Sequence, residues 1–285
     1  MTIRLGQGGR LLEGPGPFIM GIINATPDSF SDGGRYLALA DAVAGAERMV
    51  EEGADLVDLG GESTRPGSPP VDVEEELRRV VPVVERLRAR GFRLPISVDT
   101  WKGRVARAAL EAGADLVNDV RGGDDPELLA AVAAAGAPVV LQHARGASAD
   151  MQSRAVYTDV VAEVVAELRQ AIARAEAAGV APDAIVVDPG LGFAKNATHT
   201  LTLLRRLDAL RALGRPLLVG PSRKSFIGAV TGAPVAERLP GTLAAVAACV
   251  LAGVEILRVH DVREARQAAD VAAAIRDGTM PEPRE

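Results

Sequence analysis

Cysteine is almost absent from the chain, and so are the long apolar segments that direct a protein to or through a membrane. The single cysteine, Cys249, lies in an alanine-rich stretch of helical composition, which predicts a small buried side chain and excludes a disulfide framework. The first ten residues lack the apolar core of a signal peptide, and the longest apolar run, 243–257, is interrupted by Gly253 and Glu255. We therefore expect a soluble cytoplasmic protein.

The chain also lacks an excess of positive charge. The 32 Lys and Arg residues are outnumbered by 38 Asp and Glu residues, which gives a net charge of −6 and a pI near 5.3. This balance argues against a nucleic-acid groove or an anionic membrane surface as the main partner. Any site for an anion must therefore be built from a few local cations.

Lysine and asparagine each occur only three times, and their positions are informative. Asn24 and Asn118 end predicted strands, whereas Lys195 and Lys224 lie in or just after turns that follow strands. Loops ordinarily contain both residue types, so one such position would mean little. The set as a whole indicates a functional site.

The rest of the composition predicts one large α/β domain. With 48% hydrophobic residues over 285 positions, the chain can bury the core of a single barrel. A recurring pattern, in which a helix ends at a glycine and a short strand follows, occurs for example at 52–58 and 251–258. About eight such strands alternate with helices, which favours a (β/α)₈ TIM barrel over an open doubly wound sheet. We expect one domain over 1–285, with an N-terminal β-hairpin at 1–15 and a loose tail at 278–285.

Polar residues end almost every predicted strand. They are Asn24, Asp58, Asp99, Asn118, His143, Asp188, Ser222, Lys224, Arg258 and His260. In a TIM barrel the active site lies at the carboxyl ends of the strands, so these side chains should converge. Two loops at the same end, 24–36 and 60–70, are long and rich in Gly, Pro and polar residues, which is typical of segments that close over a ligand.

Several of these stretches resemble a known family. They are Gly21-Ile-Ile-Asn-Ala-Thr-Pro-Asp-Ser-Phe-Ser-Asp-Gly-Gly, Gly60-Gly-Glu-Ser-Thr-Arg-Pro-Gly, Ser97-Val-Asp-Thr, Asn118-Asp, Asp188-Pro-Gly-Leu-Gly-Phe, Ser222-Arg-Lys-Ser-Phe-Ile-Gly and Arg258-Val-His-Asp. Together they resemble the dihydropteroate synthases of folate biosynthesis, in order, from Phe18 to Ala274. The resemblance implies a pterin-binding transferase that condenses 6-hydroxymethyl-7,8-dihydropterin pyrophosphate with p-aminobenzoate to give 7,8-dihydropteroate and pyrophosphate. It also implies inhibition by sulfonamides.

The resemblance places the pterin ring on Asp99, Asn118, Asp188 and Lys224. The ring presents an amide N–H beside an exocyclic amine, and the two oxygens of Asp188 can accept from this pair of donors. Asn118 can both accept and donate at adjacent ring atoms, and the Lys224 ammonium suits the acceptor side of the ring. A Schiff base on Lys224 is the alternative, but its sequence neighbours are polar and would not depress the lysine pKa.

The pyrophosphate requires positive charge. Arg65, Arg258 and His260 are the implied residues for this group, and Asn24 resembles the family's ligand to the cofactor Mg²⁺. One amide oxygen is enough if substrate oxygens and water complete the octahedron. His260 alone could equally be a structural histidine at a strand end, and the three histidines of the chain are too scattered for a zinc site.

The p-aminobenzoate site is implied at the two long loops and at the helix that begins near residue 225. The residues assigned to it are Phe30, Thr64, Pro66, Phe193, Lys224 and Ser225. The carboxylate of this substrate would lie at the start of the helix, where backbone N–H groups favour an anion. Closure of the loops would exclude water from the reaction.

The expected chemistry is loss of pyrophosphate from the pterin CH₂ group, followed by attack of the arylamine on the resulting ring-delocalised cation. It needs no protein nucleophile, because an aromatic amine is unprotonated at neutral pH. Asp99 is the carboxylate expected near the developing cation, and Lys224, Arg258 and His260 complete the catalytic group.

One stretch departs from the family pattern. Where relatives commonly have Leu-Met-His-Met, this chain has Leu141-Gln-His-Ala, so Gln142 and Ala144 replace two methionines on the pterin side. The packing beneath the ring should therefore differ from that of the relatives.

Two alternative functions stay open at this point. A methyltetrahydrofolate to corrinoid methyltransferase shares the barrel and the pterin contacts, but it has no use for a pyrophosphate-binding set. A non-catalytic pterin-binding paralogue would have a regulatory or scaffolding role. Release of pyrophosphate on mixing both substrates would distinguish the synthase from such a paralogue.

The resemblance also implies a homodimer. Apolar helices expected at 239–250 and 265–275 could form its face. The other partners expected are the two small-molecule substrates and sulfonamide inhibitors.

Overall fold

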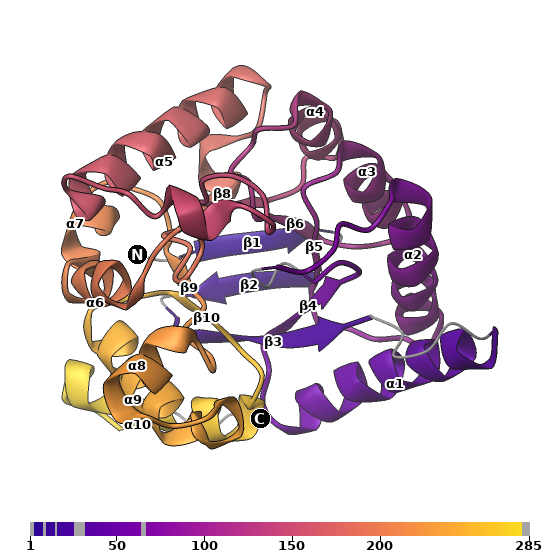
Figure 1. Ribbon diagram of the computed structural model, residues 1–285. Coiled ribbons are helices and arrows are strands. Elements are labelled where there is room, and N and C mark those ends of the chain that lie inside the picture. The colour runs from indigo at the N-terminus through magenta and orange to yellow at the C-terminus, as the bar shows by residue number, and fades with distance from the viewer. Residues whose placement is uncertain (1–2, 8–9, 15, 26–31, 64–66, 281–285) are drawn as a thin grey trace.

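The computed structural model describes residues 3–7, 10–14, 16–25, 32–63 and 67–280 (Figure 1). Eight parallel strands form one sheet. They are β3 (Phe18–Asn24), β4 (Leu56–Gly60), β5 (Ile96–Asp99), β6 (Leu116–Asp119), β7 (Val139–Gln142), β8 (Ile185–Asp188), β9 (Leu218–Val219) and β10 (Ile256–Val259). Their order is β8-β7-β6-β5-β4-β3-β10-β9, and a parallel bridge between Val187 and Leu217 closes the ring. The expected (β/α)₈ barrel is confirmed.

Helices surround this barrel (Figure 1). The α-helices are α1 (Asp32–Glu51), α2 (Val73–Ala89), α3 (Gly103–Glu111), α4 (Pro126–Ala135), α5 (Val160–Ala177), α6 (Ala197–Arg205), α7 (Leu207–Arg211), α8 (Ser225–Thr231), α9 (Leu239–Leu251) and α10 (Val262–Asp277). Short 3₁₀ helices are η1 (Met151–Arg154), η2 (Pro182–Ala184) and η3 (Val235–Glu237). Within the described parts of the chain, no helix has both the length and the apolar character needed to cross a bilayer.

Local sequence explains where the helices begin and end. Asp72, Asp125 and Asp159 precede α2, α4 and α5, and each side chain accepts a hydrogen bond from a backbone N–H of the first turn. Gly53 and Gly253 follow α1 and α9 with φ of 92° and 81°, a conformation that other residues adopt only at a cost. The helix-to-strand joins predicted from the sequence are therefore present.

The strands are buried on both faces, because helices cover the outside of the barrel and side chains fill its inside. Successive side chains of a strand point to opposite faces. One set packs outward against the helices, and the other forms an inner layer. The inner layer consists of Met20, Leu56, Leu116, Val140, Val186, Leu218 and Ile256, together with Leu5 and Leu12.

Leu5 and Leu12 come from an antiparallel hairpin, β1 (Ile3–Gln7) and β2 (Arg10–Gly14), which plugs the amino-terminal end of the barrel. Figure 1 shows the hairpin across the middle of the ring. Arg10 ties it to the barrel through a 2.8 Å ion pair with Asp115, which also pairs with Arg88. Among the described residues, the hairpin covers the amino end of the barrel, and the cavity that could admit a substrate lies at the carboxyl end.

Candidate active site

A cavity of about 350 Å³ opens at the carboxyl ends of the strands. Its wall includes Asn24, Glu62, Asp99, Gln142, Asp188, Phe193, Ser222, Lys224, Ser225, Arg258 and His260. The two-residue period of a strand explains this convergence, because a residue two positions after an inner-layer residue points inward again, one layer nearer the open end. Gln142, Asp188 and Arg258 follow Val140, Val186 and Ile256 in this way.

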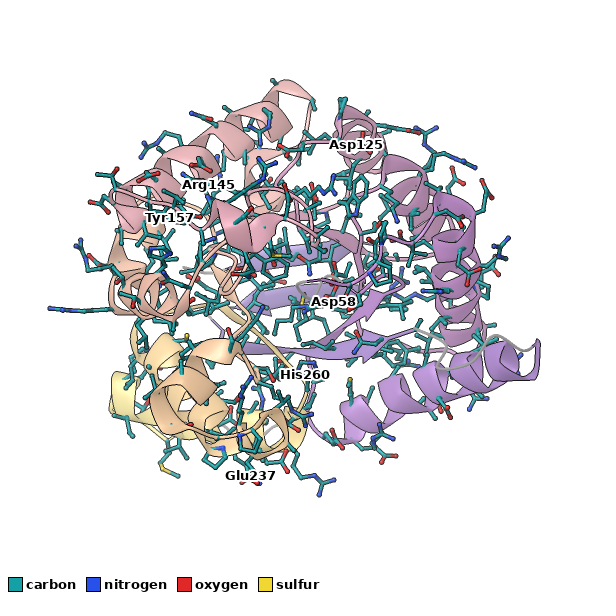
Figure 2. All side chains as sticks on the ribbon, viewed as in Figure 1. Asp58, Asp125, Arg145, Tyr157, Glu237 and His260 are labelled. Atoms are coloured by element: carbon teal, nitrogen blue, oxygen red, sulfur yellow. The ribbon has the colours of Figure 1, made fainter. Side chains whose placement is uncertain are left out.

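The floor of the cavity is a charged network centred on Arg258. Its Nε donates to Asp58 Oδ2 at 2.6 Å, and its Nη2 donates to Asp99 Oδ2 at 2.8 Å. Asn118, which is 1% exposed, donates from Nδ2 to the same Asp58 oxygen at 3.0 Å. Figure 2 shows Asp58 inside the ring of strands. Arg258 thus bridges two carboxylates, a pairing that the sequence did not predict.

Three oxygens of this network are buried without a hydrogen-bond partner among the described residues. They are Oδ1 of Asp58, of Asp99 and of Asn118. Buried polar atoms are nearly always satisfied, so three unpaired acceptors in one place point to a ligand that carries N–H groups. Burial also raises the pKa of Asp99 to about 7, with Arg258 opposing the rise and Asp58 adding to it.

Asp188 lies at the end of β8, where the following turn holds its side chain. Its Oδ1 accepts from the backbone N–H of Gly190 at 2.6 Å. Gly190 has a φ of 64°, and a Cβ at this position would lie 1.9 Å from the carbonyl oxygen of His143, so only glycine fits. Burial raises the Asp188 pKa to about 6, although Lys224 and Arg258 partly counteract it.

Lys224 caps the amino end of α8 and lies beside Phe193. Its Nζ is 4.5 Å from the centroid of the Phe193 ring, a cation–π contact. The preceding Arg223 has a left-handed φ of 55°, and its backbone N–H donates to Thr242 Oγ1 at 3.0 Å. This turn presents Lys224 and Ser225 to the cavity.

His260 and Asn24 lie at the rim. The Nδ1 of His260 is 2.9 Å from Ser222 Oγ, which fixes the ring orientation. Asn24 ends β3 with an exposed side chain. The predicted Phe30, Thr64, Arg65 and Pro66 lie outside the described residues. The other predicted site residues line the cavity, with three exceptions. Asp58 and Asn118 lie beneath it and join it through Arg258, and His143 does not line it but contacts Lys195 and Glu167.

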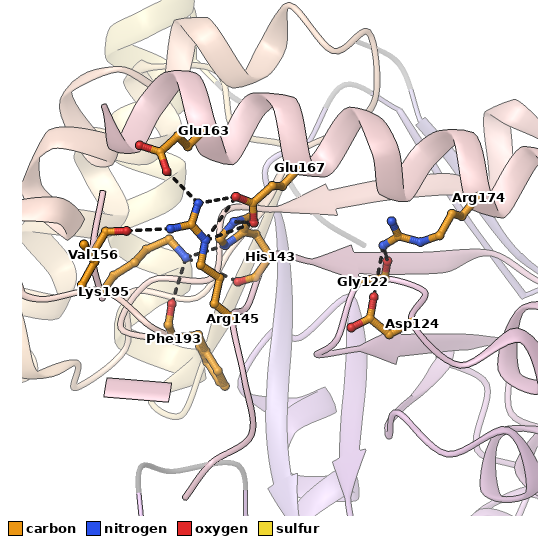
Figure 3. A network of polar contacts seen from close by, with 10 residues as sticks. All are labelled: Gly122, Asp124, His143, Arg145, Val156, Glu163, Glu167, Arg174, Phe193 and Lys195. Carbon is orange, nitrogen blue, oxygen red and sulfur yellow. Dashed lines mark hydrogen bonds and ion pairs between the residues drawn. The ribbon is translucent and has the colours of Figure 1, made fainter. Parts of the chain in front are cut away.

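A second network, behind the cavity, was not predicted (Figure 3). Lys195 is 1% exposed and donates to the carbonyl oxygen of Phe193 at 2.9 Å and to Nδ1 of His143 at 2.8 Å. His143 Nε2 contacts Glu167 at 3.0 Å, and Arg145 also pairs with Glu167. Burial lowers the Lys195 pKa to about 7. The scarcity of lysine was the only signal for this residue in the sequence.

A comparable anchor supports the second long loop. The Lys102 ammonium pairs with Glu62 and Glu76 and donates to the carbonyl oxygen of Val71 at 2.6 Å. Glu62 itself lines the cavity. Lys102 thus contacts both Glu62, near the start of this loop, and Val71, which directly follows it.

The described residues contain no group of three or more His, Cys, Asp or Glu side chains arranged to hold a metal ion. Asn24 offers a single amide oxygen at the cavity rim. Such a site fits a Mg²⁺ ion that arrives on the oxygens of a substrate, which supply most of its ligands.

Taken together, a closed barrel with buried acceptors and nearby cations around a cavity at its carboxyl end is the arrangement of an enzyme that binds a small polar ligand. The comparisons with known proteins agree with this class. The family described as pterin binding enzyme matches residues 20–260. The dihydropteroate synthase of Escherichia coli (strain K12) is 48% identical over 258 residues, which cover 90% of this chain and 91% of that protein. The corresponding protein of Synechocystis is 46% identical over 260 residues, 90% of each chain.

Solved structures give the same result. The dihydropteroate synthase of Yersinia pestis in a sulfonamide drug complex has a TM-score of 0.90 at 43% identity and covers 96% of this chain and 100% of that one. The Xanthomonas albilineans dihydropteroate synthase in complex with 7,8-dihydropteroate has a TM-score of 0.85 at 45% identity, with 96% and 98% covered. The chain therefore belongs to the pterin-binding enzymes and, among them, to the dihydropteroate synthases. The family resemblance seen in the sequence is confirmed.

Proposed function

We propose that this chain condenses 6-hydroxymethyl-7,8-dihydropterin pyrophosphate with p-aminobenzoate, and that the residues of the cavity carry out this reaction. The observation that supports the proposal most directly is the convergence of Asp99, Asp188, Lys224 and Arg258 on one cavity, with buried acceptors beneath it. Structures of the Xanthomonas albilineans enzyme contain 4-aminobenzoic acid and 7,8-dihydropteroate, one substrate and the product of this reaction.

The pterin would lie on the carboxylates of the floor. Asp188 accepts from the ring amide N–H and the exocyclic amine, and Asn118 uses its unpaired Oδ1 for a neighbouring N–H. Lys224, in the wall of the cavity, would donate to the acceptor side of the ring. Hydrogen bonds to charged groups contribute about 1.5–3 kcal/mol each, so Asp188 is the main affinity determinant.

Asp99 stabilises the transition state in this proposal. As the bond to pyrophosphate breaks, positive charge develops on the CH₂ group and the ring, and a nearby carboxylate favours it. Arg258 holds Asp99 in place, and its charge favours the ionised form of that carboxylate. The arylamine nitrogen then forms the new C–N bond to the CH₂ carbon, and the proton it loses passes to the departing pyrophosphate.

The leaving pyrophosphate would lie at the rim, near Asn24, Arg258 and His260, with Arg65 as the further proposed cation. Mg²⁺ bound to the diphosphate would neutralise charge on the leaving group. Ser222 orients the His260 ring through the 2.9 Å contact with Nδ1, and the imidazole lies in the cavity wall where the anion would bind.

The p-aminobenzoate would lie against Phe193, with its carboxylate near Lys224 and Ser225. Support comes from the contact between Lys224 and the Phe193 ring and from the position of both residues in the cavity wall. Phe30, Thr64 and Pro66 are proposed to cover this substrate from the two long loops. Sulfonamides would compete for the same place.

We also propose a cytoplasmic homodimer that uses helices α9 and α10. The support is a set of exposed large apolar side chains on these helices, Leu251, Val271 and Ile275, which are 50–68% exposed. Sedimentation of the purified protein would test the assembly.

The reaction is tested by mixing the purified protein with both substrates and Mg²⁺. We expect stoichiometric release of pyrophosphate and formation of dihydropteroate, detected by mass spectrometry, and loss of both on removal of Mg²⁺ with a chelator. Binding of pterin without any turnover would contradict the proposal and would favour the non-catalytic paralogue.

A further inference from the structure

Gln142 occupies a position in the cavity that the proposed reaction leaves unexplained. It ends β7, and its register partner in β8 is Asp188. Its side chain lies two positions after Val140 of the inner layer, so it points into the barrel. It is 6% exposed and lines the cavity.

One end of the Gln142 amide, its NH₂ group, is unsatisfied within the described part of the chain. The Nε2 atom is buried and makes no hydrogen bond to any residue that the structure describes. A buried unsatisfied donor costs a folded protein about 1–3 kcal/mol, so such a group is retained where a ligand completes it.

The neighbours of Gln142 indicate which ligand this is. In register, Gln142 lies beside Asp188 of β8 and one inward layer nearer the open end than Asn118 of β6, which pairs with Val140. Asp188 and Asn118 are the proposed contacts to the amide N–H and the exocyclic amine of the pterin. In the proposed function, Asn118 uses its Oδ1 for the second N–H of the amine and its Nδ2 for Asp58, so the ring nitrogen next to the amine, which accepts a hydrogen bond, still requires a donor.

We propose that Gln142 is a specificity-determining residue that hydrogen-bonds the amine edge of the pterin ring. Its Nε2 donates to the ring nitrogen beside the exocyclic amine, whose own N–H groups are taken by Asp188 and Asn118. The inference rests on the proposed function, because it takes the pterin as the ligand. It assigns a polar role to a position where the family pattern has methionine.

The substitution Gln142→Met separates this role from a structural one. Methionine has a similar size but no hydrogen-bonding amide. The free variant should be at least as stable as the wild type, because an unsatisfied buried donor has been removed. Its affinity for the pterin should fall about three- to tenfold, because one neutral hydrogen bond is lost.

Binding of 6-hydroxymethylpterin is measured by calorimetry, and the melting temperature of each free protein is measured in parallel. The matched control is Gln170→Met on the exposed face of α5, which should leave the affinity unchanged. A second variant, Gln142→Glu, keeps the size but places a carboxylate beside Asp188, and it should weaken pterin binding more than tenfold at pH 8.

Unchanged pterin affinity in Gln142→Met would overturn the inference. So would a joint loss of melting temperature and affinity, since that result indicates packing alone. If the wild type itself fails to bind 6-hydroxymethylpterin, the proposed function fails and takes this inference with it. If the wild type binds 6-hydroxymethylpterin and the Gln142 variants bind it equally well, the inference about Gln142 fails and the proposed function stands.

Discussion

Arg258 donates from Nη2 to Oδ2 of Asp99 at 2.8 Å, across 159 positions of the chain. The arginine compensates the buried carboxylate and leaves its other oxygen, Oδ1, without a partner among the described residues. A carboxylate held in this way is oriented for a ligand before the ligand arrives. Two predictions about the division of roles between carboxylates follow from this arrangement.

We first predict that Asp99→Asn lowers kcat by about tenfold to a thousandfold while pterin affinity changes less than threefold. The reason is that the charge of Asp99 is needed when positive charge develops, not when the neutral ring binds. Rapid-quench turnover and calorimetry with 6-hydroxymethylpterin separate the two quantities. Equal losses in both would contradict the proposed role.

Asp188→Asn should show the opposite pattern. It replaces a carboxylate that accepts from two ring donors with an amide that can accept with only one oxygen, so pterin affinity should fall at least about tenfold. The measurement is the same calorimetric titration. Wild-type affinity in this variant would place the ring elsewhere in the cavity.

The pH dependence of pterin binding follows from the same residue. Because the Asp188 pKa is raised to about 6 in the free protein, affinity for the ring donors should increase as pH rises from 5 to 7 and then level off. Calorimetry across this range checks it, and Asp188→Asn should remove the pH-dependent step. A flat profile in the wild type would be the contrary result.

Stability should change with pH in the opposite direction. The folded-state pKa values of Asp188 and Asp99, about 6 and about 7, lie above the ordinary value of 3.8, so the folded state binds protons more tightly than the unfolded state. The favourable contribution of these two carboxyl groups to the free energy of unfolding is therefore present at low pH and is lost as pH rises from about 4 to about 7. In denaturant titrations, Asp99→Asn should reduce this fall in the free energy of unfolding. An identical pH profile in the variant would exclude Asp99 as its source.

Much of this site could be predicted from the sequence because the barrel imposes its own regularity. A polar residue that ends a buried strand must point either inward or toward the helices, and the two-residue period places Asp188 and Arg258 inward. Glycine-capped helix ends such as Gly53 located the strand starts. Asp188, Lys224 and His260 were identified for this reason and by their motifs.

The remaining features depend on contacts between distant positions. The ion pairs of Arg258 join it to residues 200 and 159 positions away, and no local pattern encodes them. The same holds for Lys195, whose partner His143 is 52 positions distant. Phe30 and Arg65 remain predictions from sequence, because they lie outside the described residues.

Lys195→Met should affect p-aminobenzoate more than pterin. Lys195 holds the carbonyl group of Phe193 and thereby the ring that faces Lys224. Loss of these hydrogen bonds should raise the KM for p-aminobenzoate about five- to tenfold, with pterin affinity nearly unchanged. Steady-state kinetics and calorimetry provide the two numbers, with the exposed Arg169→Met as control. A similar loss for both substrates would indicate general disruption of the barrel end.

Asp115→Ala should destabilise the packing of the N-terminal hairpin against the barrel without changing the rate of the reaction. Asp115 is fully buried, pairs with Arg10 and Arg88, and accepts from the backbone N–H of Ile96 at 2.8 Å. Removing one member of a buried ionic cluster leaves its partners unpaired, which costs about 3 kcal/mol of unfolding free energy. The exposed pair of Arg206 and Asp208 supplies the control, since Asp208→Ala should cost less than about 1 kcal/mol. Urea unfolding gives both values, and kcat below the melting transition should equal that of the wild type. A loss in Asp115→Ala no larger than in the control would mean that the ion pairs of Asp115 do not stabilise the hairpin.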